Sequence, residues 1–372
     1  MFLSSEHRTD AFVVGAGPAG LAAAISLRRA GMDVVVADAA QPAIDKACGE
    51  GLMPDAMAAL GELGVHVPAS DGHIFHGICF RTESSAASAH FAQGKGLGVR
   101  RTVLHDLLVE HAAALGVHIL WDTRVEVKGH GQLTANGAEW TSRWIVGADG
   151  QRSRVRQFAQ LEHRQLSQRY GFRQHFSVAP WTDCVEVYWA KEGQAYVTPT
   201  GENEVCVALV MEAKTNRMAR LAEMFPSLGA RLAGQRVTTD ERGAMTICRR
   251  LPRVTRGSVA LIGEAAGSID AVTGEGLALA FKQALALGES LPQGDLEMYE
   301  RKNRQVRRTP FAMSQFMVFL GRHPGLQARI IQACERDNSL FSHLMAVHLG
   351  MRSPLKISPA SLTSFGWNMV TT

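Results

Sequence analysis

No part of this 372-residue chain approaches the ~20 consecutive apolar residues of a membrane span. Residues 1–10 carry charge and have no apolar core, so no secretory signal is visible. The six cysteines are widely spaced and form no C-x-x-C pair, which argues against a disulfide framework and against a zinc site. The net charge is only +4 and most basic residues are scattered, so nucleic-acid binding has little support. We expect a cytoplasmic protein with no metal and no nucleic-acid partner.

The sequence also lacks the patterns of several hydrolytic enzymes. It has no H-E-x-x-H, no G-x-S-x-G and no cluster with metal-ligand spacing. There is no internal repeat and no low-complexity tract, and 46% of the residues are hydrophobic. This length and composition predict one large domain or two interlocked domains with a full core.

A glycine-rich turn near the N-terminus is the first feature that indicates a ligand. Residues 11–14 form a short apolar run typical of a buried parallel strand, and residues 21–30 form an Ala-rich helical pattern. Between them, Gly15, Gly17 and Gly20 give the G-x-G-x-x-G spacing. This spacing permits a tight turn, backbone approach to a pyrophosphate and close helix–strand packing. Asp38 ends the next strand, where an acid can bind a ribose hydroxyl.

The rest of the chain predicts further elements of an α/β protein. Four apolar runs, 170–178, 184–190, 195–199 and 205–210, alternate with turns and predict a largely antiparallel sheet. Residues 258–262 predict another buried parallel strand, and residues 277–291 a long helix. Residues 295–350 read as helical, punctuated by Pro310 and Pro324, and residues 351–372 as a surface tail.

Three separated motifs together resemble a known superfamily. They are the glycine turn at 15–20, G-A-D-G-x-x-S-x-V-R at 147–156, and G-E-A-A-G followed by T-G-E-G at 263–276. Their order and spacing resemble the group A flavoprotein monooxygenases of the para-hydroxybenzoate hydroxylase superfamily, which also holds geranylgeranyl reductases and flavin halogenases. The sequence departs from that pattern at Glu264, where the family usually has Asp, and at Asp270-Ala271, where a related motif often has Asn-Pro.

The resemblance implies an α/β fold with a Rossmann-like FAD-binding domain interlocked with an antiparallel-sheet substrate domain, plus C-terminal helices. We assign residues 1–72, 97–160 and 251–292 to the FAD-binding domain, and 73–96 and 161–250 to the substrate domain. Residues 293–372 are the C-terminal helical region and tail.

The resemblance also implies FAD as the cofactor and NADPH or NADH as the electron donor. Arg101 matches a family arginine near the cofactor, with Arg100 as a rival, and a helix starting at Gly276 would stabilise the anionic reduced flavin. The predicted cofactor-binding residues are Gly15, Gly17, Pro18, Ala19, Gly20, Asp38, Ala39, Lys46, Cys48, Gly49, Arg101, Val125, Asp149, Gly150, Gly263, Glu264, Gly274, Glu275, Gly276 and Leu277.

Several chemistries are compatible with such a protein. The first hypothesis is an NAD(P)H- and O2-dependent hydroxylase of an aromatic or phenolic lipid or polyketide, acting through a flavin C4a-hydroperoxide. The second is a reductase of prenyl double bonds, which Cys48 and the T-G-E-G segment at 273–276 favour. Weaker alternatives are a flavin halogenase, and a non-catalytic lipid-binding protein on the same fold.

The candidate catalytic residues are Cys48, whose thiol can tune or protonate an intermediate, and Tyr196 and His175, which can bond a phenol. Each also has a purely structural interpretation. An apolar face follows the basic run 301–308, and it indicates either core packing or an entrance for a long-chain substrate with a peripheral membrane contact. Its residues are Phe311, Met313, Phe316, Met317, Phe319 and Leu320.

Overall fold

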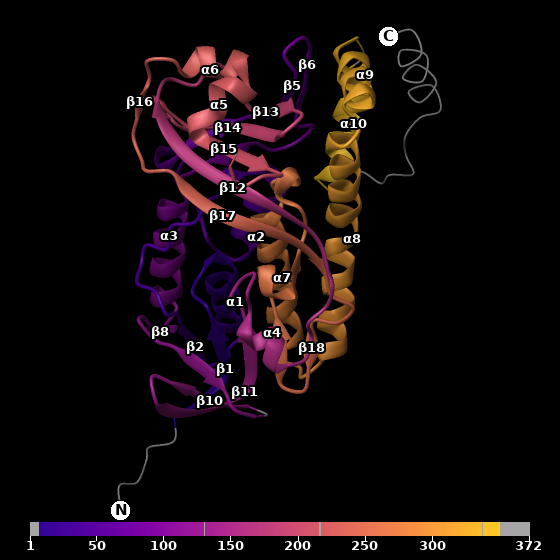
Figure 1. Ribbon diagram of the computed structural model, residues 1–372. Coiled ribbons are helices and arrows are strands. Elements are labelled where there is room, and N and C mark those ends of the chain that lie inside the picture. The colour runs from indigo at the N-terminus through magenta and orange to yellow at the C-terminus, as the bar shows by residue number, and fades with distance from the viewer. Residues whose placement is uncertain (1–6, 130, 216, 337, 350–372) are drawn as a thin grey trace, which may run out of the picture.

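A twisted, mostly parallel sheet forms the lower half of the computed structural model, which describes residues 7–129, 131–215, 217–336 and 338–349 (Figure 1). Its central strand β1 (His7–Val14) pairs in parallel with β2 (Val34–Ala37) and β11 (Ala138–Gly147). The strand order is β18-β19-β11-β1-β2-β8. The remaining strands are β8 (His118–Leu120), β18 (Thr255–Arg256) and β19 (Val259–Leu261), with β9 (Val125–Val127) and β10 (Gln132–Ala135) as an antiparallel excursion from β11.

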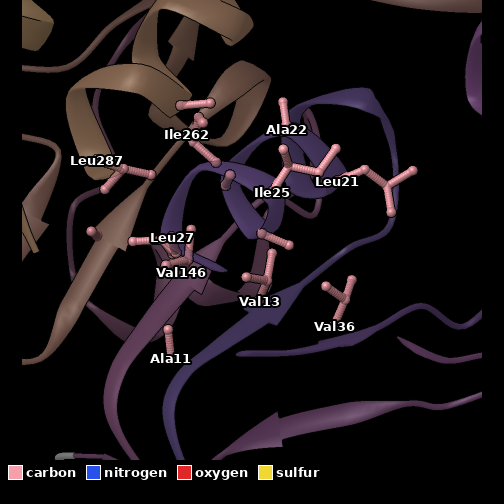
Figure 2. Close-up of a cluster of buried hydrophobic side chains, with 14 of the residues drawn as sticks. Ala11, Val13, Leu21, Ala22, Ile25, Leu27, Val36, Val146, Ile262 and Leu287 are labelled. Atoms are coloured by element: carbon pink, nitrogen blue, oxygen red, sulfur yellow. The ribbon is translucent and has the colours of Figure 1, made fainter. Parts of the chain in front are cut away.

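Helices bury this sheet because its strands are apolar on both faces. Helix α1 (Pro18–Arg29) packs closely on α7 (Gly276–Ser290) and on α3 (Arg101–Ala114). In the core between them, Val13, Ile25 and Leu287 belong to β1, α1 and α7 (Figure 2). Such continuous apolar strands are typical of parallel sheets covered by crossover helices.

A second, nine-stranded sheet lies across the upper half of the molecule (Figure 1). Its order is β20-β17-β12-β15-β14-β13-β5-β6, and its pairings are antiparallel apart from the parallel pair β13–β5. Short helices α5 (Leu221–Met224) and α6 (Pro226–Leu232) pack on it. The strands are β5 (Gly77–Arg81), β6 (Ala86–His90), β12 (Gln165–Ser177), β13 (Cys184–Ala190), β14 (Gly193–Gly201), β15 (Glu204–Met211), β17 (Arg242–Arg250) and β20 (Gly267–Ser268), with β16 (Arg236–Val237) beside β12.

Smaller elements connect the two sheets. A three-stranded sheet joins β3 (Gly51–Leu52), β7 (Gly96–Gly98) and β4 (His73–Phe75), in that order. Helix α2 (Pro54–Glu62) follows β3 and packs on α7, and the one-turn α4 (Arg154–Phe158) follows β11.

Three C-terminal helices run along one side of both halves (Figure 1). They are α8 (Leu296–Gly321), α9 (Pro324–Arg336) and α10 (Asn338–His348). Their apolar side chains form a common core with β5, β6 and β13. Pro324 begins α9, as expected, but the predicted interruption at Pro310 is wrong: α8 continues through it. Pro310 is buried, so tertiary packing offsets the one backbone hydrogen bond that it removes.

The predicted α/β fold class is confirmed, with a Rossmann-like sheet, an antiparallel sheet and C-terminal helices. The predicted tail, 351–372, lies outside the described residues. Within the described part of the chain, no helix is both long and apolar enough to cross a membrane.

The contact between α1 and α7 gives a test of the fold. A Cβ added at Gly288 would lie 2.2 Å from Ser26 Oγ and 3.0 Å from Ser26 O, so Gly288→Val would force the two helices apart. We expect a loss of ~1–3 kcal/mol in the free energy of unfolding, measured by denaturant titration. The control is Gly61→Ala on α2, where no described atom lies within 4 Å. It should stabilise the chain slightly, by ~0.5–1 kcal/mol. Equal effects of the two substitutions would contradict the packing described.

Candidate active site

A cavity of about 930 Å³ lies between the parallel sheet and the antiparallel sheet. The loops that follow β1, β2, β11 and β19 all line it, through Gly15, Asp38, Asp149 and Glu264. These loops meet because the carboxyl ends of parallel strands share one edge, where α/β sheets bind their ligands. The three sequence motifs are therefore brought into one cavity.

The glycines of the first turn have different roles in its geometry. Gly15 adopts φ +107°, and a Cβ there would lie 2.5 Å from Ala148 O. A Cβ at Gly20 would lie 1.8 Å from Gly15 O, so these two positions exclude a side chain. Gly17 differs, because no atom of the described residues lies within 4 Å of its added Cβ. It lines the cavity at the start of α1, which has no side-chain cap. A pyrophosphate can therefore approach the free amides of this helix.

Asp38 is held rigidly at the edge of the cavity. The Ala16 N–H donates to its Oδ2 at 2.7 Å, and the Ala40 N–H donates to its Oδ1 at 2.9 Å. A carboxylate has about four acceptor positions, so two remain for hydroxyl groups of a ligand. Ala39, beside it, also lines the cavity.

Lys46 and Glu264 come from distant loops and meet at the cavity. Lys46 Nζ lies 2.6 Å from Glu264 Oε2, and Gln151 Nε2 donates to Glu264 Oε1 at 3.1 Å. The longer side chain of glutamate, in place of the aspartate that the resemblance leads us to expect, thus reaches a lysine from another loop. Both residues of the ion pair are half-exposed, so the pair can rearrange to accept a ligand hydroxyl.

The structure distinguishes the two neighbouring arginines. Arg100 forms an ion pair with Glu204, with 2.7 Å between its Nε and Oε1, and this hydrogen bond raises the Arg100 pKa. Arg101 lines the cavity instead, and its buried Nε has no hydrogen-bond partner among the described residues. Arg101 is therefore the arginine that can contact a ligand.

Asp149 serves two purposes. Its Oδ2 accepts hydrogen bonds from the backbone N–H groups of Arg154, at 2.7 Å, and Val155, at 3.2 Å, at the start of α4. Its Oδ1 is buried and lacks a hydrogen-bond partner within the described part of the chain. Such an atom needs an explanation in a native protein, and a bound ligand with a donor group provides one.

The start of α7 is open toward the cavity. Gly274 adopts φ +68°, and added Cβ atoms at Gly274 and Gly276 meet no described atom within 4 Å. Both glycines and Leu277 line the cavity. The predicted site residue Glu275, between them, points elsewhere: it is buried, with its Oε2 3.6 Å from His348 Nδ1. Only the backbone of this turn is therefore available to a ligand in the large cavity.

The three candidate catalytic residues have different positions. Cys48 lines the cavity, and the Glu50 N–H donates to its Sγ at 3.4 Å. Tyr196 lines it too; its hydroxyl donates to Val272 O at 2.7 Å, and burial raises its pKa. His175 is not among the residues that line the cavity. Its Nε2 lies 2.6 Å from Glu50 Oε2, and its side chain is only 1% exposed. His175 therefore supports the loop that carries Cys48 and Glu50 and does not itself face the cavity.

A second, narrow cavity of about 100 Å³ adjoins the first, and its walls are almost entirely apolar. The two cavities share Met53, Val185, Tyr196 and Gly274. Four residues of the apolar face predicted after the basic run line it: Met313, Phe316, Met317 and Leu320. Sequence reasoning missed the contribution of α10, which has no motif. It also missed Arg124 and Arg152 at the large cavity, although their basic side chains near two motifs were a signal.

The residues of the large cavity fit FAD. Its volume and the open space at Gly17, Gly274 and Gly276 suit a dinucleotide. The unpartnered Arg101 Nε can donate to an anionic group of the ligand, and the unpartnered Asp149 Oδ1 can accept from one of its hydroxyl or N–H groups. A family model described as an FAD binding domain matches residues 8–294.

The chain belongs to this FAD-binding family. It is similar to the menaquinone reductase of Mycobacterium tuberculosis (strain ATCC 25618 / H37Rv), with 30% identity over 325 residues, 79% of each chain. It is 24% identical over 320 residues to the putative FAD-dependent monooxygenase YetM of Bacillus subtilis (strain 168), covering 75% of this chain and 83% of YetM.

Among solved structures, a flavoprotein/dehydrogenase from Cytophaga hutchinsonii superposes with a TM-score of 0.79, 20% identity and 92% of both chains covered. The likeness shows a shared fold. Together with the family match, these relatives make this protein an FAD-dependent oxidoreductase, and the non-catalytic alternative is set aside.

Gly17 provides a test of the cofactor site that does not depend on stability. Gly17→Val adds a side chain in open space next to the start of α1, and its φ of −68° suits any residue. We expect a folded protein whose FAD affinity falls at least about tenfold, or ~1.4 kcal/mol, in a flavin-fluorescence titration. Gly20→Val should instead unfold the domain, because its Cβ meets Gly15 O. FAD binding of wild-type strength in folded Gly17→Val would contradict this placement of the pyrophosphate.

Proposed function

We propose that this oxidoreductase uses FAD to saturate a double bond of a lipid that carries an isoprenoid chain, such as a prenylated quinone. The apolar cavity beside the cofactor cavity is the observation that carries this proposal. A water-soluble aromatic substrate does not need a second, apolar compartment, whereas a hydrocarbon chain gains free energy from each apolar contact.

The walls of the apolar cavity suit a flexible hydrocarbon. On one side lie strand side chains such as Ile78, Val187 and Trp189, and on the other lie Met317 and Phe341 of α8 and α10. Methionine adapts to irregular apolar shapes, so several positions of a chain can be accommodated. Gly274, at the start of α7, borders both cavities, so a chain bound in the apolar cavity would have one end beside it.

The similarity to menaquinone reductases supports the same substrate class, since menaquinone is a quinone with an isoprenoid chain. The aligned region covers 79% of each chain, so it includes residues from both sheets. NADPH or NADH is the proposed electron donor.

FAD, when bound, supplies a hydride to the substrate, and the chain's own residues prepare the site for it. Gly17 and the α1 amides would hold the pyrophosphate, and Asp38 would hold the ribose. The α7 amides would stabilise negative charge on the ring, while Tyr196 and Cys48, which line the cavity, would border the substrate. The apolar walls exclude water.

Hydroxylation of a phenolic lipid is the second candidate. The same exclusion of water protects a reactive oxygen donor, and YetM is named as a putative monooxygenase. The two candidates differ in their products and in their need for O2.

The deciding experiment supplies the flavoprotein with NADPH or NADH and a prenylated naphthoquinone, in air and under argon, with products read by mass. We expect a gain of two hydrogens located in the isoprenoid chain in both atmospheres, and it should persist after any hydroquinone has been reoxidised to the quinone. Ala87→Phe, which fills the apolar cavity, should raise KM at least about tenfold for the long-chain substrate and change it far less for a naphthoquinone that carries a single prenyl unit. A gain of one oxygen, in air only, would establish the hydroxylase instead.

The end of α8 is the proposed point of contact with a lipid surface. Phe316 and Phe319 are 40% and 47% exposed, Phe316 also lines the apolar cavity, and Arg322 and Arg329 are exposed nearby in the sequence. Aromatic and basic groups together bind anionic lipid surfaces.

We therefore expect the double substitution Phe316→Ser and Phe319→Ser to reduce sedimentation with anionic vesicles severalfold. Leu166→Ser is the control, because Leu166 is 50% exposed but lies on β12. Equal losses in the two variants would rule out a specific contact at α8.

A further inference from the structure

Three buried polar atoms without hydrogen-bond partners lie between α2, α7 and α10. They are Asp55 Oδ1, Glu275 Oε2 and His348 Nδ1, considered against all described residues. Glu275 Oε2 and His348 Nδ1 are 3.6 Å apart, and Asp55 is electrostatically coupled to both residues. Unsatisfied polar atoms are rare inside proteins, and three in one place indicate a function.

Each element contributes one part of this cluster for a local reason. Glu275 is the first residue before α7, and the left-handed turn at Gly274 directs its side chain away from the large cavity. Lys282 lies on α7, two turns after Glu275 and on the same face. Its Nζ lies 2.6 Å from Oδ2 of Asp55, which is in the first turn of α2. His348 ends α10.

The surroundings keep both members of the Glu275–His348 pair uncharged at neutral pH. Burial, aided by the Asp55 carboxylate, raises the pKa of Glu275 to about 8, although Lys282 opposes the shift. Burial lowers the pKa of His348 to about 4, against the effects of Asp55 and of a hydrogen bond to the Thr273 backbone. At pH 7 the carboxyl group therefore carries a proton and the imidazole has a free acceptor nitrogen. The carboxyl proton of Glu275 can pass to His348 Nδ1, now 3.6 Å from Glu275 Oε2, when the two side chains close to hydrogen-bond distance.

The position of the pair links solvent with the apolar cavity. His348 lines that cavity, next to Thr273 and Gly274. Lys282, at the other side of the cluster, is 32% exposed, so water has access to it. Tyr196, which also lines the cavity, donates to Val272 O, but burial raises its pKa and no acid on the described residues is placed to return a proton to it.

We propose that the Glu275–His348 pair donates the proton that completes reduction of the double bond in the apolar cavity. FAD, when bound and reduced, would supply a hydride with two electrons, which forms one C–H bond while the π bond of the alkene breaks. The His348 imidazole gives its ring N–H proton to form the second C–H bond while its other nitrogen, Nδ1, takes the carboxyl proton of Glu275, so the imidazole stays neutral. The Glu275 carboxylate that remains is reprotonated from water beside Lys282. This inference rests on the proposed reductase function.

The test compares Glu275→Gln with Glu289→Gln, an exposed position on the same helix that pairs with Lys302. We expect Glu275→Gln to lower kcat for the lipid at least about tenfold at pH 7, with FAD content and KM unchanged. Wild-type kcat should fall as the pH rises through about 8, where Glu275 loses its proton, and Glu275→Gln should lack this decline. Glu289→Gln should behave as wild type.

Thermal stability of the apoprotein gives a second readout that does not depend on activity. A carboxyl group whose pKa is raised in the folded state makes the fold less stable as pH rises from its unfolded value to about 8. His348 contributes the opposite trend between about 4 and its unfolded value, but it is present in both proteins, so it cancels. The Tm of Glu275→Gln should therefore exceed that of wild type at pH 8, and the difference should shrink toward pH 5.

The outcomes separate the two proposals. Failure of the wild type to reduce any prenylated lipid overturns the proposed function and the catalytic role that rests on it, even if the Tm difference is found. Reduction by wild type with an unchanged kcat and pH profile in Glu275→Gln overturns only the proton-donor inference. A Tm difference that does not vary with pH overturns the protonation state assigned to Glu275.

Discussion

The buried carboxylate of Glu50 is the interaction on which the site depends. Glu50 is 2% exposed and adopts φ +57°, a conformation that is rare for a residue with a side chain. Its Oε1 accepts the Arg101 N–H at 3.0 Å, and its Oε2 lies 2.6 Å from His175 Nε2. An isolated buried carboxylate would be costly, so the chain adopts this backbone only when α3 and β12 present these partners together. The loop beside the cofactor cavity is thereby fixed to both sheets.

The segment that follows Glu50 extends this constraint to both cavities. Cys48 lies before it and faces the cofactor cavity, and Met53, three residues after it, lies where the two cavities join. Asp55 comes two residues later, pairs with Lys282 and belongs to the buried cluster that also contains Glu275 and His348. A shift of this short segment would therefore alter the cofactor cavity, the apolar cavity and the buried acid together. The hydrogen-bonded cluster of Glu50, His175 and the Arg101 backbone can therefore influence a reaction that it does not touch, because it positions the residues that line both cavities.

The sequence predicted the features that depend on residues close together along the chain. Gly15, Gly17 and Gly20 act within one turn, so their spacing alone indicated a phosphate site, and the helix expected at 277–291 was found at Gly276–Ser290. The sequence could not reveal that Arg101 rather than Arg100 lines the cavity, since a salt bridge to Glu204 on another sheet decides it. It could not place His175 beneath Glu50, or His348 beside Glu275, because those contacts join residues 125 and 73 positions apart. Such contacts depend on how distant parts of the chain pack together, and no local sequence pattern predicts that packing.

The two cavities impose different electrostatic requirements on their common border. The cofactor cavity presents helix amides, Arg101 and Lys46 to an anionic ligand, whereas the neighbouring cavity is nearly free of polar groups. A charged acid or base facing the apolar side would lose its solvation and destabilise the fold. A neutral acid beside a neutral imidazole avoids that cost, because the same burial that raises the pKa of Glu275 lowers that of His348. The apolar compartment that would hold a hydrocarbon chain thus also keeps the adjacent acid protonated, and this is the state required to donate a proton.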